Sequence, residues 1–227
     1  ALAILFFSKI YIVQLFSFLF GLLAVLMTYS LSRVYRTTPV LMLVLSGMIV
    51  GALFSAGTSL LKYIADPVNQ MPSIVFWMLG SLNNASNKDL IIAGPVMLGG
   101  IVVLLLIRWR INLLAMGEEE ARSLGVETGR IRAVIIFCAT VISASAVSIS
   151  GIIGWIGLVI PHIGRILVGP DNKKLLPVVT LIGAIYLVIV DTIARTAIES
   201  EIPIGVLTAI AGAPIFAYLL RKNRSGW

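Results

Sequence analysis

Long apolar segments alternate with short polar connections along the whole chain. A window of about 19 residues finds seven candidate membrane spans in this pattern. They are expected at Ile10 to Leu31, Pro39 to Leu61, Leu90 to Ile107, Ile131 to Ser150, Ile152 to Val168, Leu176 to Thr196 and Ile204 to Leu220. A helix needs about 20 residues to cross a bilayer, so segments of this length predict an all-α, polytopic transmembrane bundle. Residues 1–227 are expected to form one transmembrane domain.

Two connections depart from the simple pattern. The fourth and fifth spans adjoin at Ser150 and Gly151, which predicts a tight hairpin or a shortened, partly re-entrant pair whose glycines allow close backbone approach. The stretch between Lys62 and Lys88 is too long for a turn. It predicts either a short helix at the outer interface, around 74–79, or a plain loop. The chain opens inside an apolar stretch without Met, so we expect a fragment that lacks upstream spans.

Composition and charge narrow the class of protein. The chain is 59% hydrophobic and 12% charged, with a mean hydropathy of +1.05, which excludes a water-soluble enzyme. The net charge of +7 could suggest nucleic acid, but thirteen of the 17 Lys and Arg residues follow the first, third, fifth and seventh spans. Only Lys9, Lys62, Lys88 and Arg195 fall on the other side. This asymmetry predicts a cytoplasmic C-terminus and no nucleic-acid partner.

Catalytic and metal-binding motifs are absent from the sequence. It contains no G-x-x-x-x-G-K-[ST] phosphate loop, and the glycines between Gly151 and Gly157 have the wrong spacing for a dinucleotide site. Cys138 lies in an apolar run and His162 is the single histidine, which argues against a metal site. We therefore expect no catalytic residue, no metal and no cofactor bound by this chain.

One charged pair lies near the outer end of the sixth span. Asp191 and Arg195 are four residues apart, so they can pair on one helix face. Arg195 is also flanked by Glu199 and Glu201, and its alternative role is an external contact for an acidic partner. The two roles are compatible if Arg195 changes partners.

Small residues recur at four-residue spacing in two spans. The second span carries Gly47, Gly51 and Ser55, and the last span carries Gly205, Ala209 and Ala213. Such stripes allow helices to pack closely within a chain. The alternative is that they face a pathway or a second copy of the subunit.

The segment from about 112 to 130 is the most specific polar feature. Gly117 precedes three glutamates, Glu118 and Arg122 form an i,i+4 pair, and Gly125 can stop a helix. These features predict a helix of one to two turns outside the bilayer. With Ala121 and Leu124 on one side of it, we expect a partner in the cytoplasm.

Three ordered motifs carry a family resemblance: LLAMGEEEARSLG, then ISGIIGWIGLVIPHIGRILVGPDNKKLLP, then DTIARTAIESEIPIGVLTAIAGAPIFAYLLRK. Together they resemble the FecCD-type permeases, the membrane subunits of ABC importers for iron-siderophore complexes, haem and vitamin B12. The resemblance implies ten spans per subunit, of which the seven here would be the fourth to tenth, in the cytoplasmic (inner) membrane of a prokaryote. The run from Gly157 to His162 matches a family signature, for which we expect only that Pro161 ends or kinks a helix.

The resemblance also implies partners and site residues. The partners would be a second permease copy, two cytoplasmic ATP-binding subunits that hold ATP and Mg²⁺, and an extracytoplasmic substrate-binding protein. The segment that docks on the ATPase would contain Leu114, Gly117, Glu118, Glu119, Arg122, Leu124 and Gly125. The pathway between the two copies would be lined by, or packed near, Gly47, Gly51, Ser55, Gly205 and Ala209, and Arg195 would contact the binding protein.

Three other functions stay open on the sequence. An ion-coupled secondary transporter would also show glycine-interrupted spans, but it should carry acids near mid-span. A permease for a molybdate or tungstate type of oxyanion would share the same architecture. A membrane scaffold without transport would not need the small-residue stripes.

Overall fold

The computed structural model describes residues 1–7, 9–33, 40–83, 85–198 and 201–222, and every regular element in these ranges is an α-helix. Pro39, where the second span is predicted to begin, and Arg36, Glu199 and Arg224 lie outside the described residues. The helices are α1 Leu2–Phe6, α2 Ile10–Ser32, α3 Val40–Ile64, α4 Gln70–Leu79, α5 Asn87–Met116, α6 Glu118–Ser123, α7 Thr128–Ser150, α8 Ile156–Val168, α9 Asn172–Thr196 and α10 Ile204–Lys222. The predicted all-α class is confirmed for these residues.

Five of the helices are long and apolar enough to cross a membrane: α2, α3, α5, α7 and α9. The other two predicted spans correspond to α8 and α10, whose described apolar parts are shorter. The 13 residues of α8 rise about 20 Å, less than the roughly 30 Å of a bilayer core. Length and composition alone therefore support five spans in the described residues.

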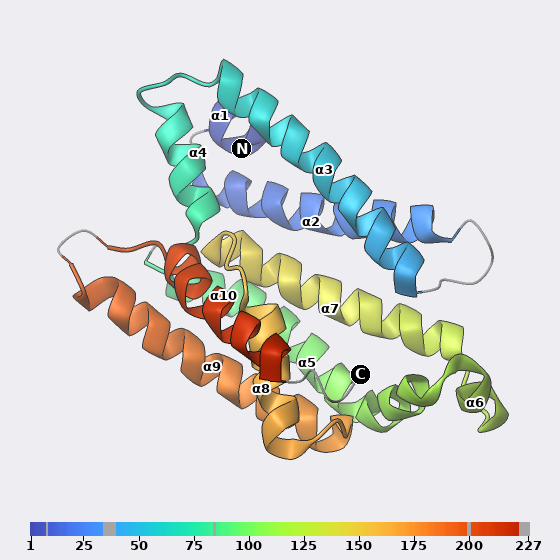
Figure 1. The fold of residues 1–227 in the computed structure, drawn as a ribbon. Helices are drawn as coiled ribbons and strands as arrows, with labels where there is room; N and C mark the ends of the chain where they lie inside the picture. The colour runs from blue at the N-terminus through green and yellow to red at the C-terminus, as the bar shows by residue number, and fades with distance from the viewer. Residues whose placement is uncertain (8, 34–39, 84, 199–200, 223–227) are drawn as a thin grey trace.

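The helices form layers around α7 (Figure 1). On one side α7 packs against α2, which in turn packs against α3; on its other side it packs against α5. Helix α9 packs on α5 and α8, and α10 packs on α8, α9 and α4. The molecule has one end at α4 and the opposite end at α6, and we call these the α4 end and the α6 end.

Helix α5 continues well past the predicted end of its span at Ile107. It begins with a capping box of Ser86 and Asp89 and runs for 30 residues to Met116. No glycine or proline follows Gly100 until Gly117, so nothing in the sequence stops the helix earlier. At about 45 Å it is longer than a bilayer core, and it therefore carries Arg108 and Asn112 on a helix instead of a loop.

At the junction of α7 and α8, α8 is short, with 13 residues, whereas α7 has 23. Helix α7 ends at Ser150 because Gly151 adopts φ +68°, and Trp155 adopts φ +67° just before α8 begins. The predicted span from Ile152 is thus helical only from Ile156, a correction caused by these two left-handed positions. Helix α8 continues through Pro161 to Val168, so this proline does not end it.

Between Lys62 and Lys88 the structure contains α4, which confirms the predicted short helix over the plain loop. Ile74 of α4 is fully buried, and the helix contacts α1 and α10. Helix α4 is therefore held by the protein as well as by any membrane interface.

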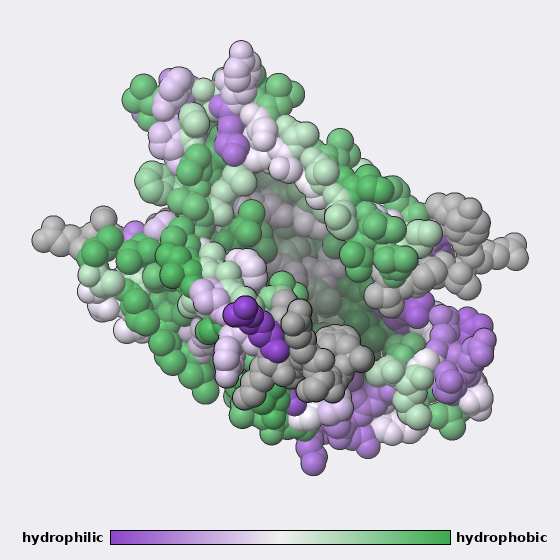
Figure 2. Space-filling view, in the orientation of Figure 1, coloured by the Kyte–Doolittle hydropathy of each residue, from purple (hydrophilic) through white to green (hydrophobic). Residues whose placement is uncertain are grey.

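Many large apolar side chains of α2, α3, α5 and α9 are exposed, and one buried apolar cluster in the described residues is small. It consists of Val190, Ala194 and Ile204, with Leu82, Ile153, Tyr186 and Leu207 packed against it. Figure 2 shows apolar side chains over much of the visible face and hydrophilic ones gathered over the α6 end. An apolar surface of this extent needs lipid or other protein to cover it.

Candidate functional site

The α6 segment is a short helix whose two ends are fixed by glycines. Gly117 lies at φ +133°, where a Cβ would strike the carboxylate of Glu120. At the other end, Gly125 at φ +78° donates its N–H to the Arg122 carbonyl at 2.9 Å, and Val126 donates to the Ala121 carbonyl at 3.0 Å. These two bonds form a Schellman motif, which ends the helix after Ser123. The predicted helix and its glycine stop are confirmed.

Glu118 ties α6 to α7. Its carboxylate pairs with Arg122 at 2.9 Å and with Arg132 of α7 at 3.4 Å, and it accepts a hydrogen bond from the Thr128 hydroxyl at 3.2 Å. Partial burial raises the pKa of Glu118, but Arg132, Thr128 and Arg122 outweigh that effect and hold the pKa below its usual value. Glu118 is therefore an internal anchor of the segment.

The outward face of α6 differs from the predicted one. Ala121 is fully buried against the rest of the chain, so it does not share an exposed face with Leu124, which is 58% exposed. That part of the prediction is wrong, because α6 packs on both α5 and α7. Glu119, Arg122 and Gly125 are exposed, whereas Leu114 and Gly117 are half-buried. The surface open to a partner consists of Met116, Glu119, Leu124 and their exposed neighbours on α6.

The two small-residue stripes have different surroundings. In α3, Gly51 and Ser55 are exposed, nothing lies within 4 Å of a Cβ built on Gly51, and one on Gly47 meets only Thr28 at 3.9 Å. In α10, a Cβ on Gly205 would strike the carbonyl oxygen of Leu79 and lie 2.9 Å from that of Ile152. Gly205 is therefore a packing position, while the α3 stripe lies on an open face.

Gly205 belongs to a junction of three glycines at the α4 end, which the sequence did not reveal. Gly80 ends α4 at φ +74° and Gly151 ends α7 at φ +68°. Ser81 donates its N–H to the Ser150 carbonyl at 2.9 Å, and Ile204 donates to the Gly80 carbonyl at 3.0 Å. We call Gly80, Gly151 and Gly205 the glycine junction. Ala209, one turn further along α10, is half-buried.

Arg195 lies at the same end and has partners within the chain. Its Nε donates to Asp191 at 2.9 Å, which confirms the predicted pair, and its Nη1 donates to the Asn83 side-chain oxygen at 3.3 Å. The Arg195 side chain is 42% exposed. An acidic partner could therefore reach it, but only in competition with Asp191 and Asn83.

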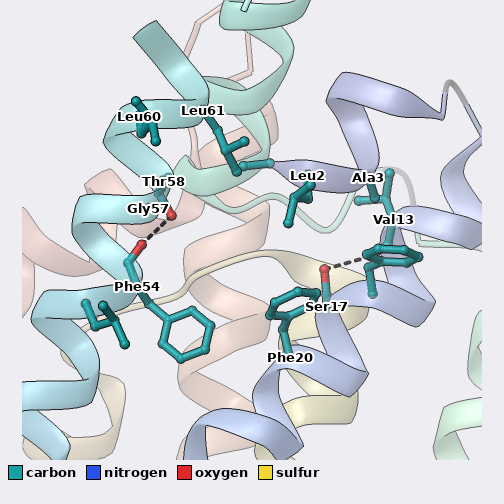
Figure 3. A pocket seen from close by; sticks show the side chains of 13 residues that line it. Leu2, Ala3, Val13, Ser17, Phe20, Phe54, Gly57, Thr58, Leu60 and Leu61 are labelled. Carbon is teal, nitrogen blue, oxygen red and sulfur yellow. Dashed lines mark hydrogen bonds between the residues drawn. The ribbon is translucent and has the colours of Figure 1, made fainter. Parts of the chain in front are cut away.

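A cavity of about 510 Å³ lies between α1, α2 and α3 (Figure 3). Its walls are mainly apolar, with Phe20 and Phe54 on facing helices. The Ser17 and Thr58 hydroxyls that line it donate to carbonyls of their own helices, at 2.7 and 2.8 Å. The cavity therefore presents little polar chemistry to a ligand.

Side chains that commonly ligate metals do not cluster in the described residues. These residues contain no group of three or more His, Cys, Asp or Glu side chains that could hold a metal ion. His162 packs edge-on against Phe216, with ring centroids 5.4 Å apart, and Cys138 is buried.

Comparison with known proteins identifies the family to which this sequence is related. The sequence model of the FecCD transport family matches residues 1–222. The chain belongs to this family. The α6 segment and the motifs around α8 and α10 are thus features of a FecCD chain.

Among curated relatives, the molybdate import system permease protein of Haemophilus influenzae is 42% identical over 225 residues, 99% of this chain and 67% of its own length. A probable iron chelatin transport system permease protein of Helicobacter pylori is 40% identical over 93% of this chain and 64% of its length. The cobalamin import system permease protein of Halobacterium salinarum is 40% identical over 93% of this chain and 56% of its length. The chain thus spans about two thirds or less of the length of these relatives.

A solved structure agrees with the fold. It is described as an inward-facing conformation of a transporter assigned to the metal-chelate ABC type, and it matches with a TM-score of 0.91 at 42% sequence identity. The match covers 97% of this chain and 70% of that one. The helix arrangement in Figure 1 is therefore similar to that of the matched chain of this transporter.

Proposed function

We propose that the chain is the larger part of a permease subunit of an ATP-driven ABC importer for a metal chelate, such as an iron-siderophore complex, haem or cobalamin. The observation that carries this proposal is the family match over residues 1–222, together with relatives named for iron chelate and cobalamin transport. In this proposal the chain contributes seven of ten spans, with α8 and α10 counted among them, and its C-terminus is cytoplasmic.

The α6 segment is the proposed docking element for the ATPase. ATP binding closes two cytoplasmic ATP-binding subunits, which hold ATP and Mg²⁺, and the docked α6 carries that motion to the spans. The exposed Leu124 and Met116 beside the carboxylate of Glu119 offer an apolar and acidic surface to a groove on the partner. Glu118 and its partners on α7 keep this surface fixed to the bundle.

The pathway would run between two copies of the permease. The exposed Gly51 and Ser55 support a role of α3 at that pathway or at the contact between copies, because no other part of the described chain covers them. Gly205 is proposed to hold α10 in place next to the pathway. At the α4 end, Arg195 would leave Asn83 or Asp191 to meet an acidic residue of the substrate-binding protein.

An oxyanion such as molybdate is the second candidate ligand. It is favoured by the molybdate permease of Haemophilus influenzae, which is 42% identical over 99% of this chain. Small and apolar pathway residues do not indicate whether the ligand is a chelate or an oxyanion, so the identity of the transported ligand must be determined by experiment.

The test is reconstitution of the full-length subunit with its ATP-binding subunit and binding protein in proteoliposomes. Uptake of a ferric siderophore, haemin, cobalamin and molybdate is measured with and without ATP. We expect ATP-dependent uptake of one of the chelates. Uptake of molybdate alone would favour the second candidate, and uptake driven by an ion gradient without ATP would contradict both.

A further inference from the structure

A polar contact joins α5 to the turn between α8 and α9, close to where α6 begins. Asn112 donates from Nδ2 to the Asp171 carboxylate, and its Oδ1 accepts the N–H of Asn172 at 2.8 Å. One turn earlier, Arg108 donates from Nη1 to the Lys173 carbonyl at 3.2 Å. We call these five residues the Asn112 clasp.

Asp171 also caps the N-terminus of α9. The oxygen that accepts from Asn112 also accepts the N–H of Lys173 at 2.9 Å, which caps α9. The hydrogen bond from the Lys173 N–H lowers the pKa of Asp171 most, and the bond from Asn112 lowers it further. Together they hold this pKa below its usual value, although burial acts in the opposite direction. The carboxylate is therefore ionised at neutral pH, and charge-assisted bonds of this kind are stronger than neutral ones.

The clasp lies on a continuous route through the molecule. Asn112 is five residues before Gly117, and Glu118 fixes α6 to α7. Beyond the clasp, α8 and α9 both pack on α10, as Figure 1 shows. A displacement of α6 can thus reach α10 through α5 and the α8–α9 turn.

We propose that Asn112 is a positioning residue that transmits movement of the α6 segment to α9 and α10; this inference rests on the proposed function of α6. Helices α5 and α9 also pack on each other directly. In addition, the Asn112 side chain is bonded both to the Asp171 carboxylate and to the Asn172 N–H. The turn that contains these two groups therefore moves when α5 moves. The clasp makes α5 and the start of α9 move as one unit.

Three variants separate this role from general packing. Asn112→Ala removes both bonds of the side chain but leaves the Lys173 cap of α9 intact. Asn112→Asp keeps the acceptor for Asn172 and places a second carboxylate against Asp171. Asp171→Asn, the matched control, keeps the oxygen acceptor for both donors and removes only the charge.

The measurement is hydrogen exchange of the complete complex in lipid nanodiscs, without nucleotide and with a non-hydrolysable ATP analogue. In the wild type we expect nucleotide to change exchange in peptides of α6 and of α10. In Asn112→Ala and Asn112→Asp, the change at α6 remains. At α10, the ratio of the exchange rates measured with and without nucleotide falls by about 2- to 30-fold. Exchange of α9 without nucleotide should stay at the wild-type level, which separates lost transmission from local unfolding.

Rescue provides the second arm. Asp171→Asn should keep most of the wild-type response at α10, because its side-chain oxygen can still accept from Asn112 and Lys173. Adding it to Asn112→Asp should restore part of the response, because the two carboxylates no longer repel. A wild-type response at α10 in both Asn112 variants, or an equal loss in Asp171→Asn, would overturn the proposal. If nucleotide does not change the hydrogen exchange of α6 in the wild type, the proposed docking function of α6 is contradicted instead.

Discussion

Gly205→Ala and Gly51→Ala place the same methyl group in two stripes that look alike in sequence but differ in structure. At Gly205 the new Cβ would lie 2.9 Å from the Ile152 carbonyl oxygen and still closer to that of Leu79. These carbonyls have little freedom to retreat, because the neighbouring backbone is held by the bonds from Ser81 to Ser150 and from Ile204 to Gly80. At Gly51 nothing lies within 4 Å.

The expected cost at Gly205 follows from overpacking, about 1–3 kcal/mol. For a chain of this size 1 kcal/mol shifts the melting temperature by about 2–4 °C, so Gly205→Ala should melt roughly 2–12 °C below the wild type. Gly51→Ala adds helix propensity without a clash, so its melting temperature should stay the same or rise by about 1–4 °C.

The assay is thermal unfolding of the purified subunit in detergent, followed by tryptophan fluorescence. Trp77 reports on the glycine junction, because Gly151 lies against its carbonyl, and Trp155 reports on α10 through its contact with Gly212. A Gly205→Ala protein as stable as the wild type would refute the packing role. An equal loss in Gly51→Ala would refute the open face of α3.

Three further predictions concern the two ends of the molecule. Glu119→Lys and Leu124→Asp should each weaken co-purification with the ATP-binding subunit at unchanged melting temperature, whereas Lys88→Glu at the α4 end should leave it intact. Arg195→Glu should weaken docking of the binding protein in surface plasmon resonance, most strongly at low salt. The Glu118 anchor should hold α6 against hydrogen exchange at neutral pH and lose that protection in acid.

The sign of the acid effect follows from the lowered pKa of Glu118. A depressed folded-state pKa stabilises α6 above the unfolded value of about 4.3, and that stabilisation disappears as the pH falls through the folded value. Protection should thus be constant from pH 8 to about 5 and fall below about 4, and Glu118→Gln should lack this transition. Unaltered protection of wild-type α6 at pH 3 would contradict the anchoring role of Glu118.

Unchanged binding of the ATP-binding subunit to the Glu119 variant, together with unchanged binding of the substrate-binding protein to the Arg195 variant, would contradict the proposed contacts.

Local patterns in the sequence were enough to predict the helices that depend on neighbours along the chain. Hydropathy located the long helices, Gly117 and Gly125 bounded α6, and the four-residue spacing predicted the pair of Asp191 and Arg195. Each of these features is set within one or two helical turns, where spacing and propensity act.

Contacts between distant segments could not be predicted in the same way. The glycine junction joins positions 80, 151 and 205, and Asn112 meets Asp171 across 59 residues, with no periodicity to connect them. The burial of Ala121 depends on how α6 lies against α5 and α7, which the composition of α6 does not determine. Gly205 and Gly51 have the same spacing signal, and only packing separates them.

The decisive measurement is ligand uptake into proteoliposomes that contain the full-length subunit, its ATP-binding subunit and its binding protein. The importer proposed here should accumulate a metal chelate only when ATP is supplied, and Leu124→Asp should abolish that uptake while the subunit stays folded. Uptake that persists without ATP under an ion gradient, or that is unaffected by Leu124→Asp, would contradict transport driven through the α6 segment.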